Sequence, residues 1–415
     1  MEKITLPNGA RILYERTDFL KSATFGVWVG TGSRHETAAL SGASHYIEHM
    51  LFKGTEKRDC AALSEAFDLL GGHSNAYTTK EMTAFYARAL DDRVGEAVEL
   101  ITEMLFSSRF DPVDMENERG VIVEEIGMYE DDPEDLATER LSEIVFPRSS
   151  LGRPILGTKR SLAGLGREEL LAYMREKYVG ENTVAVISGN FDPEALSLLQ
   201  EKLSGMPRGK KNRAKPATYR PGVFLKKKKY EQNHIGLLWN GYSRKDERRY
   251  AAALLSAILG GGASSRLFRK VRDEEGLCYS IYSYTGSTEN EGLFGVYTAT
   301  GRENEKKALE TTIREIDRLR EKGVESEELA RAKEKNRTSL LLSLESTGAR
   351  AAYMARNELF DGKVPSYEEV LARYDAVSEH DLKEAARDLL TPESLSYAAV
   401  GRIGEKEYYE GLLRK

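Results

Sequence analysis

The pattern of apolar and polar positions predicts alternating strands and helices along the whole chain. Runs of β-branched and aromatic residues closed by Gly or Pro turns are typical of strands. Apolar residues three and four positions apart are typical of helices. We expect strands at 4–6, 10–14, 23–29, 74–79, 82–90, 183–189, 235–239 and 395–401, and helices at 44–52, 60–70, 94–107, 114–129, 167–178 and 250–259.

The same succession of elements occurs twice. The apolar strand around Gly26 is matched by the one around Gly236, 210 residues later, and the strand ending at Gly189 by the one ending at Gly401, 212 residues later. A consistent offset near half the chain predicts an internal duplication. We therefore expect an α+β fold of two similar domains, each a mostly antiparallel sheet covered by helices. The expected bounds are a first domain at 1–205, a linker rich in Pro, Gly and basic residues at 206–222, and a second domain at 223–415.

One helical segment carries the chemistry. His45 and His49 are four residues apart, so their imidazoles lie on one helix face, one turn apart. Two neutral ring nitrogens at that spacing can bind one zinc ion, and Glu48 lies close enough to reach a water beside it. The order His-x-x-Glu-His is a known catalytic arrangement. The alternative is two surface histidines on an amphipathic helix. The second half has no histidine at the corresponding place, residues 259–263.

A catalytic zinc site needs a third protein ligand. The other four histidines form no spaced motif, so a carboxylate is the better candidate, and the helix 114–129 offers four: Glu116, Glu118, Glu124 and Glu125. Glu118 and Glu125 are seven apart and share a face, whereas Glu124 points elsewhere. An acidic solvent-exposed face is the alternative. Spacing alone does not decide among these four acids.

Composition narrows the classes of function. The chain has 61 Lys and Arg against 67 Asp and Glu, a net charge of −6, which gives no overall attraction for nucleic acid or acidic lipid. No apolar run approaches the roughly 18 residues that a membrane span needs. The N-terminal residues lack an apolar signal region, and only Cys60 and Cys278 are present, as suits a reducing compartment. We expect a cytoplasmic protein that binds neither nucleic acid nor membrane.

Two further segments have competing interpretations. The basic run 226–229 is either a patch for nucleic acid or acidic lipid, or a solvated strand edge protected by lysines; the absence of interleaved aromatic residues favours the edge. The glycines at 260–262 suggest a phosphate-binding loop, but no Gly-Lys-Ser or Gly-Lys-Thr follows them, so nucleotide binding is not expected.

Four segments together resemble the motifs of the pitrilysin/insulinase (M16) family of zinc metallopeptidases: 42–55, 71–78, 118–126 and 151–157. The resemblance extends across nearly the whole chain. The short length of the chain is similar to that of members of the processing-peptidase branch of the family. It implies that His45, His49 and Glu125 are the ligands of one zinc ion per chain, with Glu125 76 residues after His49. It also implies that Glu48 is the general base and that Glu118 supports the site.

The resemblance extends to the second half. Arg272 and Tyr279, seven apart, resemble a pair that binds the substrate carbonyl and stabilises the oxyanion. Family members enclose a chamber with four such domains, which implies a homodimer in which Arg272 and Tyr279 of one subunit lie over the zinc of the other. The bare sequence would leave Arg272 as a surface charge of its helix.

We therefore predict a zinc-dependent endopeptidase that cleaves extended or unfolded peptides within a closed chamber. The strand 74–79, with Asn75, Ala76 and Tyr77, is the expected edge for pairing with an extended substrate. A precursor-processing peptidase with a different partner chain is one alternative. A non-catalytic scaffold subunit of the same fold is the alternative from another class.

Overall fold

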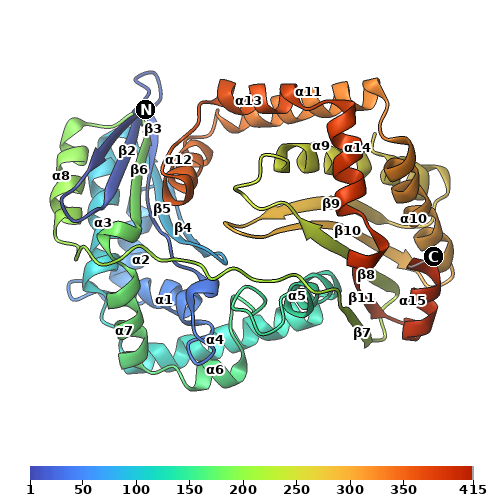
Figure 1. Ribbon diagram of the computed structural model, residues 1–415. Helices are drawn as coiled ribbons and strands as arrows, with labels where there is room; N and C mark the ends of the chain where they lie inside the picture. The colour runs from blue at the N-terminus through green and yellow to red at the C-terminus, as the bar shows by residue number, and fades with distance from the viewer. Residues whose placement is uncertain (414–415) are drawn as a thin grey trace. The chain divides into compact units, whose positions relative to one another are not determined.

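Two sheets of equivalent strand order organise the chain in the computed structural model, which describes residues 1–413 (Figure 1). The first sheet has the order β1-β2-β6-β3-β5-β4, and only β2 and β6 run parallel in it. The strands are β1 (Glu2–Thr5), β2 (Arg11–Arg16), β3 (Ser22–Val29), β4 (His73–Thr78), β5 (Thr83–Leu90) and β6 (Thr183–Gly189).

The second sheet has the order β7-β11-β8-β10-β9, again with a single parallel pair, β7 and β11. Its strands are β7 (Val223–Lys227), β8 (Gln232–Gly241), β9 (Ser280–Ser287), β10 (Gly292–Gly301) and β11 (Ser396–Gly401). Strand for strand, this order repeats β2-β6-β3-β5-β4. The register repeats too: Gly26 pairs with Val186 in the first sheet, and Gly236 pairs with Ala398 in the second. These pairs carry the two offsets found in the sequence, so the predicted duplication is confirmed.

Helices cover both sheets. They are α1 (Ala43–Leu51), α2 (Cys60–Leu69), α3 (Val94–Ser107), α4 (Pro112–Asp131), α5 (Pro133–Val145), α6 (Lys159–Ala163), α7 (Arg167–Lys177), α8 (Pro193–Ser204), α9 (Arg249–Gly260), α10 (Glu305–Lys322), α11 (Ser326–Ser343), α12 (Thr347–Asp361), α13 (Tyr367–Ala376), α14 (Glu379–Leu389) and α15 (Lys406–Leu413). Within residues 1–413, no helix is both long and apolar enough to cross a membrane.

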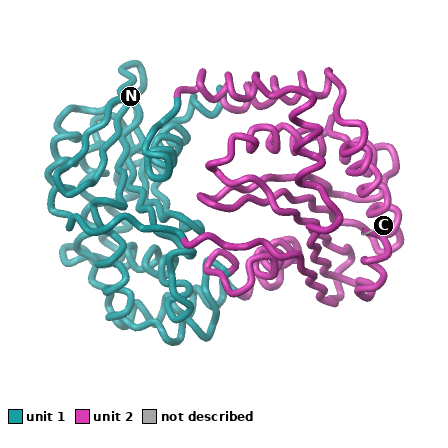
Figure 2. Tube along the Cα trace, viewed as in Figure 1, with its two compact units in different colours: residues 1–126, 153–214, 341–365 teal, residues 127–152, 215–340, 366–415 magenta. Residues whose placement is uncertain are grey.

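The chain forms two compact units that are not contiguous in sequence (Figure 2). Unit 1 comprises 1–126, 153–214 and 341–365, and unit 2 comprises 127–152, 215–340 and 366–415. Compared with the expected halves 1–205 and 223–415, residues 127–152 of the first half belong to unit 2, and residues 341–365 of the second half belong to unit 1. One boundary between the units, at 214 and 215, falls inside the expected linker 206–222.

Burial on both faces of each sheet explains the exchange. Every residue of β6 and of β11 is buried, so each sheet needs helices on two faces. In unit 1, α12 covers the face that carries Trp28 and Val184, while α1, α3, α7 and α8 cover the other. In unit 2, α5 covers the face that carries Leu238 and Ala398. Each half of the chain thus supplies the helix that closes the sheet of the other unit.

Candidate metal centre

Helix α1 directs two imidazoles to the same side. Its buried residues include Tyr46, Ile47 and Met50, which anchor it in the core of unit 1. His45 and His49 lie one turn apart, and their ring centroids are 4.6 Å from each other. The predicted spacing therefore places both rings on one face.

Helix α4 supplies a carboxylate to these rings. Glu125 Oε2 lies 3.7 Å from His45 Nε2 and 3.8 Å from His49 Nε2. One donor atom from each of the three side chains lies within 4.8 Å of the other two, the only such grouping of three or more His, Cys, Asp or Glu side chains among residues 1–413. Glu124 is exposed. The structure thus brings together the three predicted ligands.

The donor set fits a catalytic zinc ion. Two His nitrogens and one Glu oxygen, with room for a further ligand, form a known set for catalytic zinc. Burial, and then the neighbouring His49, lowers the pKa of His45 to about 3, so its ring is neutral and its lone pair is available at neutral pH. Burial raises the pKa of Glu125, and a cation held between the three side chains would favour the charged carboxylate instead.

A second carboxylate on α4 orients one of the rings. Glu118 is buried, and its Oε2 lies 3.0 Å from His49 Nδ1. Its other oxygen, Oε1, lies 2.7 Å from Lys53 Nζ, near the C-terminal end of α1. A carboxylate at Nδ1 holds the Nδ1–H tautomer, so that the Nε2 lone pair faces Glu125. The two acids that share a face of α4 therefore both reach α1.

Glu48 lies beside the three donors and is held from β4. Thr78 Oγ1 donates a hydrogen bond of 2.5 Å to Glu48 Oε2. Burial is the largest influence on this carboxyl and raises its pKa; the Thr78 hydrogen bond and His49 oppose the rise, and Glu125 adds to it. A carboxylate with a raised pKa is closer to the range suited to taking up and releasing a proton near neutrality.

The first turn of α1 is capped by a carboxylate from the loop that precedes the helix. Gly42 is the N-cap, and because glycine has no side chain it cannot satisfy the first helical N–H groups itself. The buried carboxylate of Glu36 accepts hydrogen bonds from the backbone N–H of Gly42 and of Ser44, each 2.8 Å. Burial raises the pKa of Glu36 to about 7. Glu36 thus fixes the end of α1 that leads into His45.

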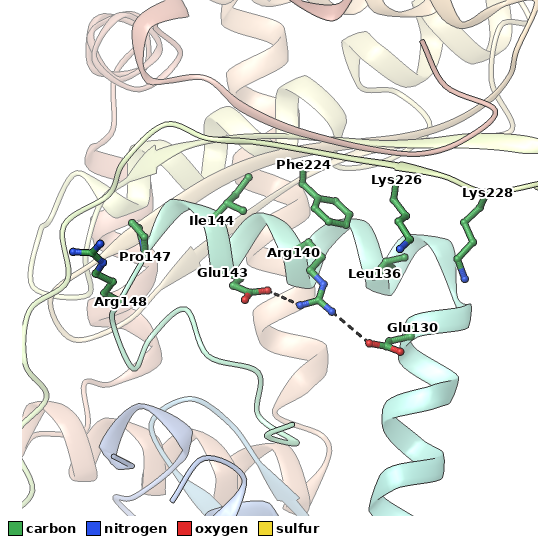
Figure 3. Close-up of a pocket in the computed structure, with 10 residues that line it drawn as sticks. All are labelled: Glu130, Leu136, Arg140, Glu143, Ile144, Pro147, Arg148, Phe224, Lys226 and Lys228. Carbon is green, nitrogen blue, oxygen red and sulfur yellow. Dashed lines mark hydrogen bonds and ion pairs between the residues drawn. The ribbon is translucent and has the colours of Figure 1, made fainter. Parts of the chain in front are cut away.

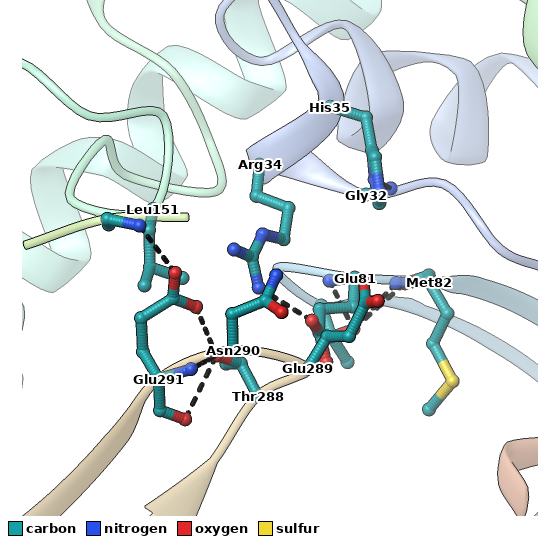
Figure 4. Close-up of polar contacts among 12 residues, drawn as sticks. Gly32, Arg34, His35, Glu81, Met82, Leu151, Thr288, Glu289, Asn290 and Glu291 are labelled. Atoms are coloured by element: carbon teal, nitrogen blue, oxygen red, sulfur yellow. Dashed lines mark hydrogen bonds and ion pairs between the residues drawn. The ribbon is translucent and has the colours of Figure 1, made fainter. Parts of the chain in front are cut away.

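The loop before α1 is tied to the turn after β4. Ser33 N–H and Arg34 N–H donate to the carbonyls of Thr79 and Lys80. The Arg34 guanidinium also forms a buried ion pair of 2.7 Å with Glu81 (Figure 4). These bonds fix the position of α1 against β4, so the geometry between Glu48 and Thr78 is built into the backbone.

Family models match both halves of the chain. Residues 11–159 match the family described as Insulinase (Peptidase family M16), and residues 164–336 match the Peptidase M16 inactive domain. The chain is 37% identical to the uncharacterized zinc protease YmxG of Bacillus subtilis, over 94% of this chain and 96% of the relative. It is 38% identical to an uncharacterized zinc protease of Streptomyces coelicolor, over 98% and 91%.

The chain belongs to the M16 peptidase family. Solved structures share its fold. An M16 inactive-domain protein from Pseudomonas fluorescens gives a TM-score of 0.90 at 19% identity, over 97% of this chain and 98% of the other. A chain of complex III from Candida albicans gives 0.85 at 22% identity, over 99% of both. The fold is thus found in a protein named for an inactive domain and in a chain of complex III2.

The expected substrate strand of this M16 protein is an edge strand. β4 pairs with β5 and ends the sheet of unit 1. Asn75, Ala76 and Tyr77 all lie on it, as predicted from 74–79. The Tyr77 hydroxyl accepts a hydrogen bond of 3.1 Å from Trp28 Nε1, so this side chain is anchored to the sheet.

Arg272 and Tyr279 lie in unit 2, at the segment that leads into β9. The Arg272 guanidinium stacks over two rings, 4.5 Å from the Phe268 centroid and 5.4 Å from that of Tyr279. Tyr279 is 73% exposed, unusual for a large aromatic residue. The structure therefore brings these two predicted residues together on one surface of unit 2.

Sequence reasoning did not identify Glu36, Lys53 or Thr78 as parts of the site. Their roles depend on contacts between separate elements, which hydrophobic periodicity does not encode. One observation could have pointed to Glu36: a helix that begins at Gly42 lacks a side-chain N-cap, so its N–H groups need an acceptor from elsewhere.

Proposed function

We propose that this M16 protein is a zinc-dependent endopeptidase that cleaves extended or unfolded peptides. The observation that carries the proposal is the convergence of His45 Nε2, His49 Nε2 and Glu125 Oε2, with the carboxylate of Glu48 beside them. The relatives named zinc proteases support it. His45, His49 and Glu125 would hold one zinc ion.

Zinc bound at this site would supply a Lewis acid that polarises the scissile carbonyl and acidifies water. The chain's own part is proton transfer and orientation. Glu48 takes the proton of the attacking water and passes it to the leaving amine. Thr78 fixes the Glu48 carboxylate by its hydrogen bond and limits the rise of its pKa. Glu118 keeps the His49 ring in the productive tautomer.

Substrate binding is assigned to the open edge of β4. An extended peptide added there gains main-chain hydrogen bonds, whereas the strand edge selects only weakly among its side chains. Asn75, Ala76 and Tyr77 supply the backbone for this pairing, and Thr78 at the end of the same strand leads to Glu48. An unfolded peptide can adopt this extended geometry, whereas most of the backbone of a folded protein is already hydrogen-bonded within its own helices and sheets.

Oxyanion stabilisation is assigned to Arg272 and Tyr279. Preorganised donors are most effective where charge develops in the transition state. The exposure of Tyr279 and its stacking with Arg272 suit a pair that faces a substrate. We assign the pair to the zinc site of a partner subunit, in a homodimer that encloses a chamber in the cytoplasm.

Metal analysis combined with peptide cleavage tests the proposal. Purified protein should contain about one zinc per chain and cleave an unstructured peptide, and a chelator should abolish cleavage until zinc is restored. Glu48→Gln is the matched control, because it should keep zinc and lose turnover. Stoichiometric zinc without cleavage of any of a panel of unstructured peptides would contradict the proposal.

A non-catalytic scaffold is the second candidate function. The likeness in fold to an M16 inactive-domain protein and to a chain of complex III favours it. The grouping of His45, His49 and Glu125 counts against it, because a scaffold has no need for converging ligands. Absence of both zinc and cleavage would support the scaffold.

A further inference from the structure

A groove in unit 2, lined by none of the three proposed zinc ligands, carries the inference. It lies between α5 and β7 and has a volume of about 710 Å³ (Figure 3). Its basic lining residues are Arg140, Arg148, Lys226 and Lys228, and its acidic ones are Glu130 and Glu143. The groove includes part of the basic run 226–229 that the proposed peptidase chemistry does not use.

The two-residue period of β7 explains which side chains enter the groove. Phe224, Lys226 and Lys228 alternate along the chain and project toward α5 (Figure 3), whereas Val223 and Leu225 pack into the core on the other face. Leu136 and Ile144 on α5 complete an apolar floor with Phe224. The groove is therefore apolar at its base and basic along its rim.

The positive charge of the groove is only partly compensated. Arg140 is paired with both acids, at 2.6 Å to Glu143 and 3.5 Å to Glu130. Lys228 lies 3.4 Å from the exposed Asp131. Within residues 1–413, neither Lys226 nor Arg148 has an ion-pair partner, although the whole chain carries a net charge of −6. Two cations are thus left to attract an acidic ligand.

The backbone of β7 favours an extended ligand. In the second sheet β7 pairs only with β11 and is the edge strand. The carbonyl of Gly222 and the N–H of Lys228 bond to β11, so alternation turns the main-chain groups of Val223, Leu225 and Lys227 to the open edge. An added strand would meet these groups and lay alternate side chains into the groove.

From these observations we infer that the β7 edge and the groove beneath it bind an acidic, extended peptide. The main chain of the peptide pairs with β7, its acidic side chains meet Lys226 and Arg148, and its apolar side chains cover Phe224. This site is separate from the zinc ligands, and its occupancy does not depend on peptide cleavage. The opposing explanation is that the lysines only block unwanted edge pairing.

A binding experiment separates the two explanations. The probe is a fluorescent peptide in which Glu and Val alternate, and the protein is the full chain carrying Glu48→Gln, so that no turnover interferes. We expect saturable anisotropy that weakens with salt. The double variant Lys226→Ala with Arg148→Ala should raise the dissociation constant about tenfold, as for the loss of two exposed ion pairs.

Lys227→Ala is the matched control, because Lys227 is on the same strand but on the opposite face, where it pairs with Glu405. It should leave the dissociation constant unchanged. A peptide with Lys in place of Glu should not bind. Equal affinity in the double variant and in Lys227→Ala, binding of the Lys peptide, or no binding of the Glu peptide would each overturn the inference.

Methylation of the peptide backbone tests strand addition apart from charge. Two versions of the probe carry N-methyl groups on alternate residues, one set on the Glu residues and one on the Val residues. Only one set of amides faces β7 in an added strand, so one version should lose binding and the other keep it. Equal binding of both versions would refute strand pairing. The groove would then bind the peptide through charge alone, contrary to the inference.

Discussion

Glu118 Oε2 lies 3.0 Å from His49 Nδ1, while Glu118 Oε1 lies 2.7 Å from Lys53 Nζ. One buried carboxylate thus joins the helix of the two imidazoles to the helix of the third donor. Because His49 lies in the last turn of α1 and Lys53 directly follows that helix, the contact fixes both the position of α1 along α4 and the tautomer of the ring.

Loss of this carboxylate should weaken metal binding without removing it. We expect Glu118→Ala to lower zinc affinity about 10- to 100-fold, since the ring loses its orienting acceptor while all three ligands remain. Titration against a chelating dye measures the affinity. Glu116→Ala on the exposed side of α4 is the control, because Glu116 pairs with Arg119 on its own helix. Unchanged affinity in Glu118→Ala would show that the contact has no influence on the metal.

Glu48→Gln should separate metal binding from turnover. The amide keeps the size of the side chain but cannot take up a proton, so the rate of peptide cleavage should fall by about 10²- to 10⁴-fold while zinc content stays unchanged. Glu125→Ala should lose zinc affinity as well. Equal zinc content in Glu125→Ala and in the unmodified protein would refute the assignment of Glu125 as a ligand.

Thr78→Val should shift the acid limb of the pH–rate profile of peptide cleavage to higher pH. The Thr78 hydroxyl lowers the pKa of Glu48, against the rise caused by burial. Without it the pKa of Glu48 rises further, so the active carboxylate form appears at higher pH and the acid limb moves upward. Thr78→Ser keeps the hydroxyl and should restore the original limb. Coincident profiles for Thr78→Val and the unmodified protein would contradict a positioning role.

The sequence predicted some features of the fold and of the site and left others open. The offset that relates Gly26 to Gly236 and the spacing of His45 and His49 can be found directly in the sequence, and the structure confirms the elements that they predict. The choice of Glu125 among four acids on one helix rested on the resemblance, because it depends on how α4 packs against α1. The exchange of α5 and α12 between the units was not foreseen, since an amphipathic helix does not specify which sheet it covers.

Glu36 should make the stability of the metal-free protein depend on pH. Its pKa is about 7 in the folded state, raised by burial from 4.5, so the folded state binds the proton more tightly than the unfolded state. The stabilisation from the protonated form is complete below about pH 4.5 and is lost as pH rises through about 7. Glu36→Gln cannot ionise. The melting temperature of Glu36→Gln relative to that of the unmodified protein should therefore rise between pH 5 and pH 8.

His35 makes a contribution to the pH dependence of stability that is opposite in sign to that of Glu36. Its ring accepts a hydrogen bond from Gly32 N–H, and burial together with Arg34 lowers its pKa to about 4. Its contribution to stability is therefore lost as pH falls from about 6.5 to 4. Because this effect is common to Glu36→Gln and the unmodified protein, it cancels in their difference. A difference in melting temperature that does not change with pH would contradict the raised pKa of Glu36.

A mixture of two inactive variants tests whether subunits share a site. Glu48→Gln leaves Arg272 intact, and Arg272→Ala leaves Glu48 intact. If Arg272 acts on the zinc of its partner, a mixed dimer holds one complete site, and random exchange restores about one site in four. Within-chain action predicts that no mixture recovers activity. The measurement is peptide cleavage after subunit exchange, with mixed dimers verified by two affinity tags. A verified mixed dimer without activity would refute sharing, and recovery would place Arg272 and Tyr279 over the partner's zinc.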